Sequence, residues 1–84
     1  EMPQQERTVT GQVVDGDDRS PLPGVNILLK GTNLGTTTDF DGNFSIKVPS
    51  DQSVLVFSYI GYQTIEIVVG TQTNLAVSLP VDAQ

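Results

Sequence analysis

Hydrophobic and polar residues alternate along most of the chain with a period of two. The pattern begins near the N-terminus, where Val9, Gly11 and Val13 alternate with Thr and Gln residues. A period of two places successive side chains on opposite faces of an extended backbone, so it predicts strands that bury one face. No stretch carries the longer period of an amphipathic helix. The pattern predicts short strands at residues 7–14, 25–30, 35–38, 43–48, 53–60, 62–69 and 75–79.

The stretch 36–48 carries a strong local signal. A Thr-rich segment runs into Asp41-Gly42, and a second alternating segment follows. Asp-Gly between two alternating runs is typical of a β-hairpin, because glycine takes the positive φ that the turn needs. We therefore predict that the strands at 35–38 and 43–48 pair as a hairpin. The second strand is expected to face the core with Phe44, Ile46 and Val48.

The run from Ser53 to Ile60 is the most apolar part of the chain. Ser58 suits the solvent face. Because side chains alternate between the two faces of a strand, this choice assigns Leu55, Phe57 and Tyr59 to the core. A flat, uncharged, β-prone run would invite aggregation at a sheet edge, so we expect it to be paired on both sides. The same phase leaves three apolar residues facing outward or lying under a neighbour: Val54, Val56 and Ile60.

These short strands, separated by turn-forming residues, predict an all-β domain: a seven-stranded antiparallel β-sandwich of Ig-like or transthyretin-like architecture. A small barrel is the alternative. At 84 residues the chain is long enough for one domain. We place the sandwich at residues 7–80, after a disordered lead-in at 1–6 and before a frayed tail at 81–84.

The formal net charge is −6, with four basic residues against ten acidic ones. This balance argues against binding to nucleic acid and to anionic lipid, both of which attract clustered Lys and Arg. No run approaches the roughly 18 apolar residues that span a bilayer, so we expect no direct membrane insertion by this segment. The chain has no Cys, which leaves its redox compartment open, and it starts with Glu1, as a processed or excised segment would.

The chain contains neither His nor Cys. This composition excludes Ser-His-Asp triads, Cys nucleophiles and nearly all types of zinc site. Paired carboxylates alone can serve a glycosidase, but a small sandwich offers little concave surface to hold a sugar. The sequence predicts no enzyme activity, no catalytic residues and no cofactor.

Asp39 and Asp41 are the candidates for a metal site, because they flank a tight turn and carry oxygen ligands. The EF-hand pattern fails here, since counting from Asp39 puts Phe44 at the position of the obligatory Gly. We interpret the two Asp residues as turn formers that accept backbone hydrogen bonds. The Asp15–Asp18 cluster is interpreted as a solvated loop. For Phe40 and Tyr62 we expect core or rim packing rather than sugar stacking.

Several motifs occur together in an order that resembles a known family. They are Thr8-Val9-Thr10-Gly11, Pro21-Leu22-Pro23-Gly24-Val25, Lys30-Gly31-Thr32, Gly35-Thr36, Thr38 to Phe44 and Phe57-Ser58-Tyr59-Ile60-Gly61-Tyr62. With this order the chain resembles the carboxypeptidase-regulatory-like (CarboxypepD_reg-like) domain over residues 7–80. The version it is most similar to is the N-terminal extension of SusC/RagA-type TonB-dependent outer-membrane receptors of Bacteroidetes.

This resemblance implies a transthyretin-like (prealbumin-like) sandwich on the periplasmic side of the outer membrane, as part of a larger exported protein. The implied function is that of a non-catalytic interaction or accessory domain of a receptor that imports glycans or other nutrients. The implied partners are proteins: the rest of the receptor and the TonB energy-coupling machinery. Val54, Val56 and Ile60 are the candidate partner surface. The alternative is an accessory (glycan- or calcium-binding) or spacer domain of a secreted or surface enzyme.

Overall fold

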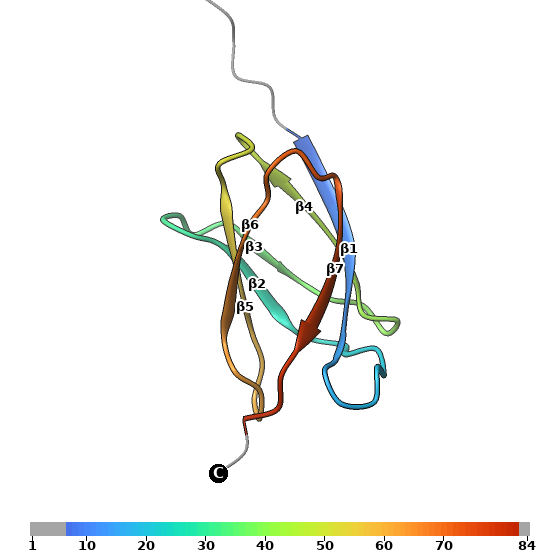
Figure 1. Ribbon diagram of the computed structural model, residues 1–84. Helices are drawn as coiled ribbons and strands as arrows, with labels where there is room; N and C mark the ends of the chain where they lie inside the picture. Colours follow the sequence, from blue (N-terminus) through green and yellow to red (C-terminus); the bar gives the residue numbers. More distant parts are fainter. Residues whose placement is uncertain (1–6, 83–84) are drawn as a thin grey trace, which may run out of the picture.

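The computed structural model describes residues 7–82, which form seven strands and no helix (Figure 1). The predicted lead-in at 1–6 and the last two residues of the predicted tail lie outside the described residues. No helix in the described part is long and apolar enough to cross a membrane. The strands are β1 (Arg7–Asp15), β2 (Asn26–Leu29), β3 (Gly35–Thr37), β4 (Asn43–Val48), β5 (Val54–Ser58), β6 (Ile65–Val68) and β7 (Asn74–Leu79).

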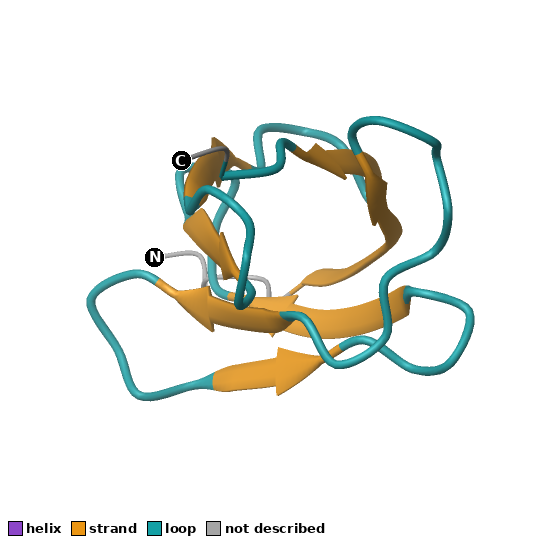
Figure 2. Cartoon of the chain, turned by 90° about the horizontal axis from the view of Figure 1, so that it is seen from below, coloured by secondary structure: helices purple, strands orange, loops and turns teal. Residues whose placement is uncertain are grey.

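The strands divide into two sheets that face each other, with the order β4-β1-β7 in one and β3-β2-β5-β6 in the other (Figure 2). This arrangement confirms the predicted all-β, seven-stranded sandwich. It also confirms that the apolar run at 53–60 is paired on both sides, because β5 lies between β2 and β6.

One pair of strands departs from the antiparallel prediction. β1 and β7 run parallel, with Thr10 opposite Asn74 and Asp15 opposite Leu79, whereas every other pair of named strands is antiparallel. Parallel strands need a long crossover connection. Here the connection consists of the five intervening strands, so the parallel pair needs no special local sequence and leaves no local signal.

The predicted hairpin at 35–48 is wrong. β3 pairs with β2, while β4 pairs with β1 in the other sheet. The intervening turn therefore carries the chain between the two layers. The reason lies at Thr38, which is buried and ties the end of β3 to the preceding loop: its hydroxyl donates to the Leu22 carbonyl at 2.5 Å and accepts from the Val25 amide at 2.9 Å.

The core lies between the sheets and follows the predicted alternation. Phe44 and Phe57 meet edge to face across it, with ring centroids 5.6 Å apart. Gly11 faces the Phe44 ring, and a Cβ at this position would lie 2.8 Å from that ring and 2.2 Å from the Leu75 carbonyl oxygen. The other buried apolar residues are Val9, Val13, Leu22, Val25, Ile27, Leu29, Ile46, Val48, Leu55, Val69, Leu75, Val77 and Leu79.

The chain crosses the sandwich from one end to the other (Figure 1). β1 and β7 start at the same end, and both finish at the opposite end. There the residues after β7 are held by the turn between β5 and β6: Gln63 N–H donates to the Pro80 carbonyl at 2.9 Å, and Asp82 N–H donates to the Gly61 carbonyl at 3.0 Å. The predicted tail at 81–84 thus begins with two residues that contact the fold.

Candidate interaction surfaces

The outer face of the four-stranded sheet carries an apolar patch. Val54 and Val56 point outward from β5 and are half-buried. The register places Val68 of β6 opposite Val54 and Leu28 of β2 opposite Val56. Leu28 and Val68 are exposed by 42% and 59%. We call Leu28, Val54, Val56 and Val68 the outer patch.

An ion pair lies at the border of the outer patch. Lys30 Nζ is 3.0 Å from Glu66 Oε1, and the register places Glu66 opposite Val56. Both side chains are at least half exposed. Exposed pairs of this kind stabilise a fold by only about 0–1 kcal/mol. The pair therefore marks a polar margin and adds little to stability.

Ile60, the third member of the predicted partner surface, does not belong to the outer patch. It lies in the turn that follows β5 and is 94% exposed. Leu28 and Val68, which the sequence analysis did not select, take its place. The sequence could have indicated both residues, because each is apolar at a position that the alternating pattern assigns to the solvent face.

The turn at Asp39–Asn43 uses its first Asp to bind its own backbone. Asp39 Oδ1 accepts from the amides of Asp41 and Asn43, both at 2.9 Å, and Gly42 N–H donates to the Asp39 carbonyl. Gly42 has a φ of 78°, as the turn chemistry predicted. Within residues 7–82, no three His, Cys, Asp or Glu side chains come together in a way that could hold a metal ion. The geometry of Asp39 agrees with the interpretation as a turn former, and Asp39 and Asp41 stay no more than candidates for a metal site.

The loop after β1 is organised by Asp15 in the same way. Asp15 Oδ1 accepts from the Asp17 amide at 2.6 Å, and Asp15 Oδ2 accepts from the Tyr62 hydroxyl at 2.5 Å. The hydrogen bond from Tyr62 is the main cause that lowers the pKa of Asp15. The same bond, with burial and the nearby carboxylates, raises the pKa of Tyr62 to about 12. This contact ties the end of β1 to the turn before β6.

The two candidate aromatic residues differ in their surroundings. Tyr62 is half-buried and packs against the core, as predicted. Phe40 is 93% exposed, so the expectation that it packs in the core or at its rim is wrong. The reason is local, because Phe40 sits at the tip of a turn whose Asp39 and Gly42 are committed to closing it.

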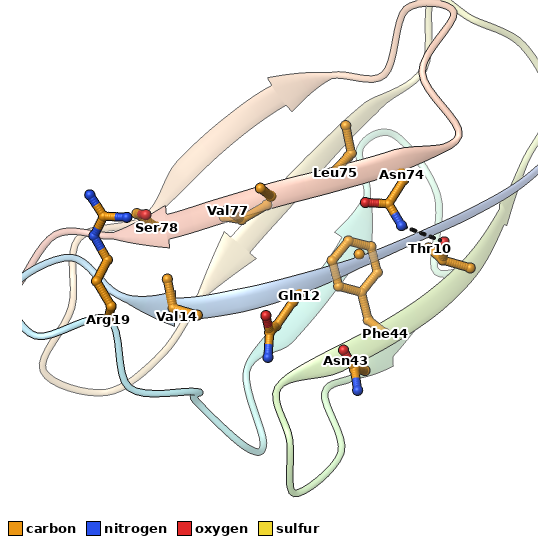
Figure 3. Close-up of a pocket in the computed structure, with 12 residues that line it drawn as sticks. Thr10, Gln12, Val14, Arg19, Asn43, Phe44, Asn74, Leu75, Val77 and Ser78 are labelled. Carbon is orange, nitrogen blue, oxygen red and sulfur yellow. Dashed lines mark hydrogen bonds between the residues drawn. The ribbon is translucent and has the colours of Figure 1, made fainter.

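A shallow hollow with both polar and apolar lining lies over the three-stranded sheet (Figure 3). Side chains of β1, β4 and β7 line it with amides and hydroxyls, including Gln12, Asn43 and Ser78, and Arg19 lies at one end. Asn74 Nδ2 donates to Thr10 Oγ1 at 3.2 Å across β1 and β7. Such a lining can form hydrogen bonds with a polar partner. The sequence analysis did not single it out, because alternating polar residues are also what an ordinary solvent face requires.

Two facing sheets, a parallel pair of first and last strands and exposed patches on the outer faces define the class of this molecule. It is an all-β sandwich module of Ig-like architecture. Nothing among the described side chains resembles a catalytic constellation.

The chain belongs to the CarboxypepD_reg-like domain family, whose model matches residues 9–84. This confirms the predicted resemblance. TonB-dependent receptor P3 of Formosa agariphila is 54% identical over 93% of this chain and 8% of its own length. TonB-dependent receptor P39 of the same organism is 45% identical over 90% of the chain and 7% of its own length.

TonB-dependent receptor SusC of Bacteroides thetaiotaomicron is 44% identical over 84% of the chain and 7% of its own length. The chain thus spans less than a tenth of these relatives. The names of all three describe receptors rather than enzymes.

Proposed function

We propose that this chain is a non-catalytic accessory domain of a TonB-dependent outer-membrane receptor, located on the periplasmic side of the membrane. The observation that carries the proposal is the 54% identity to a TonB-dependent receptor over 93% of the chain. The imported substrate class is glycans or other nutrients. One relative with the same kind of name, SusC, comes from a second organism, which supports a role shared among such receptors.

Within this function the domain acts by contacting protein. The outer patch supports this role, because Leu28 and Val68 expose large apolar side chains on a flat sheet face next to Val54 and Val56. Adjacent exposed apolar residues on one face are typical of interaction sites. The partners we propose are the rest of the receptor and the TonB energy-coupling machinery, and Ile60 supplies a separate contact point.

Deletion in the full-length receptor tests this proposal. Removal of residues 7–82 should lower the uptake of a labelled glycan while the amount of receptor in the outer membrane stays the same. A second strain, in which an unrelated sandwich of similar length replaces the domain, separates an interaction role from a spacer role. Uptake restored by the unrelated sandwich would favour the spacer, and unchanged uptake after deletion would contradict any role in transport.

A further inference from the structure

The charged residues of the sandwich are divided between its two ends. Three of the four basic residues lie towards the end where β1 starts. Arg7 donates to the carbonyls of Gly70 and Gln72. Lys47 of β4 lies opposite Thr8 of β1, and the backbone amide of Lys30 donates to the Val54 carbonyl at the start of β5. Asp51 and Glu66 are the only acidic residues that accompany them between residues 7 and 82. Among residues 7–82 this half therefore holds three basic and two acidic side chains and has no excess of carboxylates.

The opposite end, where β1 and β7 finish, is strongly acidic. Arg19 is the one basic residue among the described residues at this end, so six carboxylates against one guanidinium give a formal charge of −5. The described carboxylates are therefore concentrated at this end, which presents a negative electrostatic potential to a partner. The acidic residues of this end are Asp15, Asp17, Asp18, Asp39, Asp41 and Asp82.

The same end carries the two most exposed large apolar side chains of the described residues. Phe40 is 93% exposed and Ile60 is 94% exposed, each at the tip of a tight turn. The turn geometry does not require either side chain, since the turns are closed by Asp39, Gly42 and backbone groups. A single exposed apolar side chain is ordinary, so these two indicate a binding contact only if further apolar residues lie beside them and form a patch.

Contacts connect the surroundings of these two residues. Phe40 borders an open hollow that Pro23, Gly24 and Thr38 also line. A Cβ on Gly24 would lie 3.8 Å from the Tyr59 ring, and Tyr59 directly precedes Ile60. We call Pro23, Phe40, Tyr59, Ile60, Tyr62 and Val81 the Phe40–Ile60 surface.

Tyr59, Tyr62 and Val81 form the part of this surface that lies away from Phe40. The ring of Tyr59 packs at 5.8 Å from that of Tyr62, which forms a β-bridge with the partly exposed Val81. Tyr59 thus lies between the hollow beside Phe40 and the bridge of Tyr62 with Val81.

We propose that the Phe40–Ile60 surface is a docking site for a positively charged protein segment that offers apolar contacts to Phe40 and Ile60. Charge complementarity selects this occupant, because the surrounding carboxylates attract Lys and Arg. They also repel nucleic acid and anionic lipid. A second copy of the chain would have to place its acidic end against its own like charge, which disfavours a symmetric dimer. The inference does not depend on the identity of the receptor that we propose above.

The test is a binding titration of the 84-residue chain with an unstructured synthetic peptide of lysine, leucine and proline, followed by nuclear magnetic resonance of the backbone amides. The expected shift changes cluster at residues 39–42, 59–63 and 81–82. The double variant Phe40→Ser/Ile60→Ser should bind about tenfold more weakly, as expected for two anchoring side chains. Leu34→Ser is the matched control, because Leu34 is 62% exposed but lies in the loop between β2 and β3, which adjoins the start of β5 through the hydrogen bond from Lys30 N–H to the Val54 carbonyl.

The charge contribution is tested separately with Asp17→Asn/Asp41→Asn, because the side chains of these two residues accept none of the hydrogen bonds that close the loops. This variant should also bind more weakly, and added salt should reduce the difference between it and the unmodified chain. Thermal melting checks that each variant folds.

Shift changes that cluster on the outer patch or at the end where β1 starts would overturn the proposal. So would binding by Phe40→Ser/Ile60→Ser within about twofold of the unmodified chain. Self-association in sedimentation experiments that this double variant abolishes would assign the surface to a second copy instead.

Discussion

Thr38 is the buried polar residue on which the path of the chain between the two sheets depends. Its hydroxyl is satisfied twice, as donor to Leu22 and as acceptor from Val25, and the side chain is 6% exposed. A buried backbone group that loses its partner keeps its full desolvation penalty. Thr38 therefore stabilises the fold mainly through the hydrogen bonds that it makes with two buried backbone groups, and less through the burial of its own side chain.

Thr38→Val is expected to destabilise the fold by about 1–3 kcal/mol, because the Val25 amide and the Leu22 carbonyl lose this partner. Urea unfolding measures the change. Thr36→Val is the control, since Thr36 is half-buried and its hydroxyl makes no hydrogen bond with any residue in the described part of the chain. Equal effects of the two substitutions would contradict the role assigned to Thr38.

The contact between Tyr62 and Asp15 gives stability a pH dependence at both extremes. The pKa of Asp15 is lowered in the folded state, chiefly by the Tyr62 hydrogen bond, so its contribution is present above the ordinary pKa of 3.8 and is lost as pH falls through the lowered value. The pKa of Tyr62 is raised from 10.0 to about 12, so its contribution is present below pH 10 and is lost as pH rises towards 12.

Tyr62→Phe should remove both effects at once. In the variant, the carboxyl resonance of Asp15 should titrate closer to its ordinary pKa, because the largest cause of the shift is gone. The absorbance step of a tyrosine that ionises near pH 12 should disappear as well. Tyr59→Phe serves as the matched substitution. If the Asp15 titration is the same in the unmodified chain and in Tyr62→Phe, the hydrogen bond is not the cause of the shift.

At the scale of elements, the alternating pattern identified where the strands run but not which strands pair. The inward residues of β4 and β7 follow the predicted phase, because burial of one face is a property of the strand itself. The pairing of β4 with β1 depends on a contact between distant segments. The Asp41-Gly42 signal correctly predicted a tight turn, yet a turn fixes only its own backbone. The register with β1 and the Thr38 hydrogen bonds to the loop before β2 hold the two flanks in different sheets.

The turn itself can be tested with a matched pair of substitutions. Asp39→Ala removes the acceptor for the amides of Asp41 and Asn43 and should lower the free energy of unfolding by about 1 kcal/mol. Asp41→Ala should change it by less than about 0.5 kcal/mol, since the Asp41 side chain accepts neither of these bonds. Chemical denaturation of both variants measures the difference, and a larger effect at Asp41 would contradict the geometry of the turn.

At the scale of the whole molecule, the domain presents two kinds of exposed apolar surface. The outer patch is a flat sheet face, and the Phe40–Ile60 surface is a set of turn tips within an acidic end. The sequence pattern located Val54, Val56 and Ile60 but grouped them together, because the predicted strand ran to Ile60, whereas β5 ends at Ser58. The strand phase already assigned Leu28 and Val68 to the solvent face, whereas their place beside Val54 and Val56 and the exposure of Phe40 became clear only from the folded chain.

Glycan uptake by cells that carry a patch variant of the full-length receptor tests the central claim most directly. Leu28→Thr/Val68→Thr keeps strand-forming residues in β2 and β6 but removes apolar area from the outer patch. If the domain acts by contacting protein through this face, uptake should fall while the amount of receptor stays constant. Ala76→Ser, on the outer face of the other sheet, should leave uptake unchanged. Full uptake in the patch variant would contradict the account.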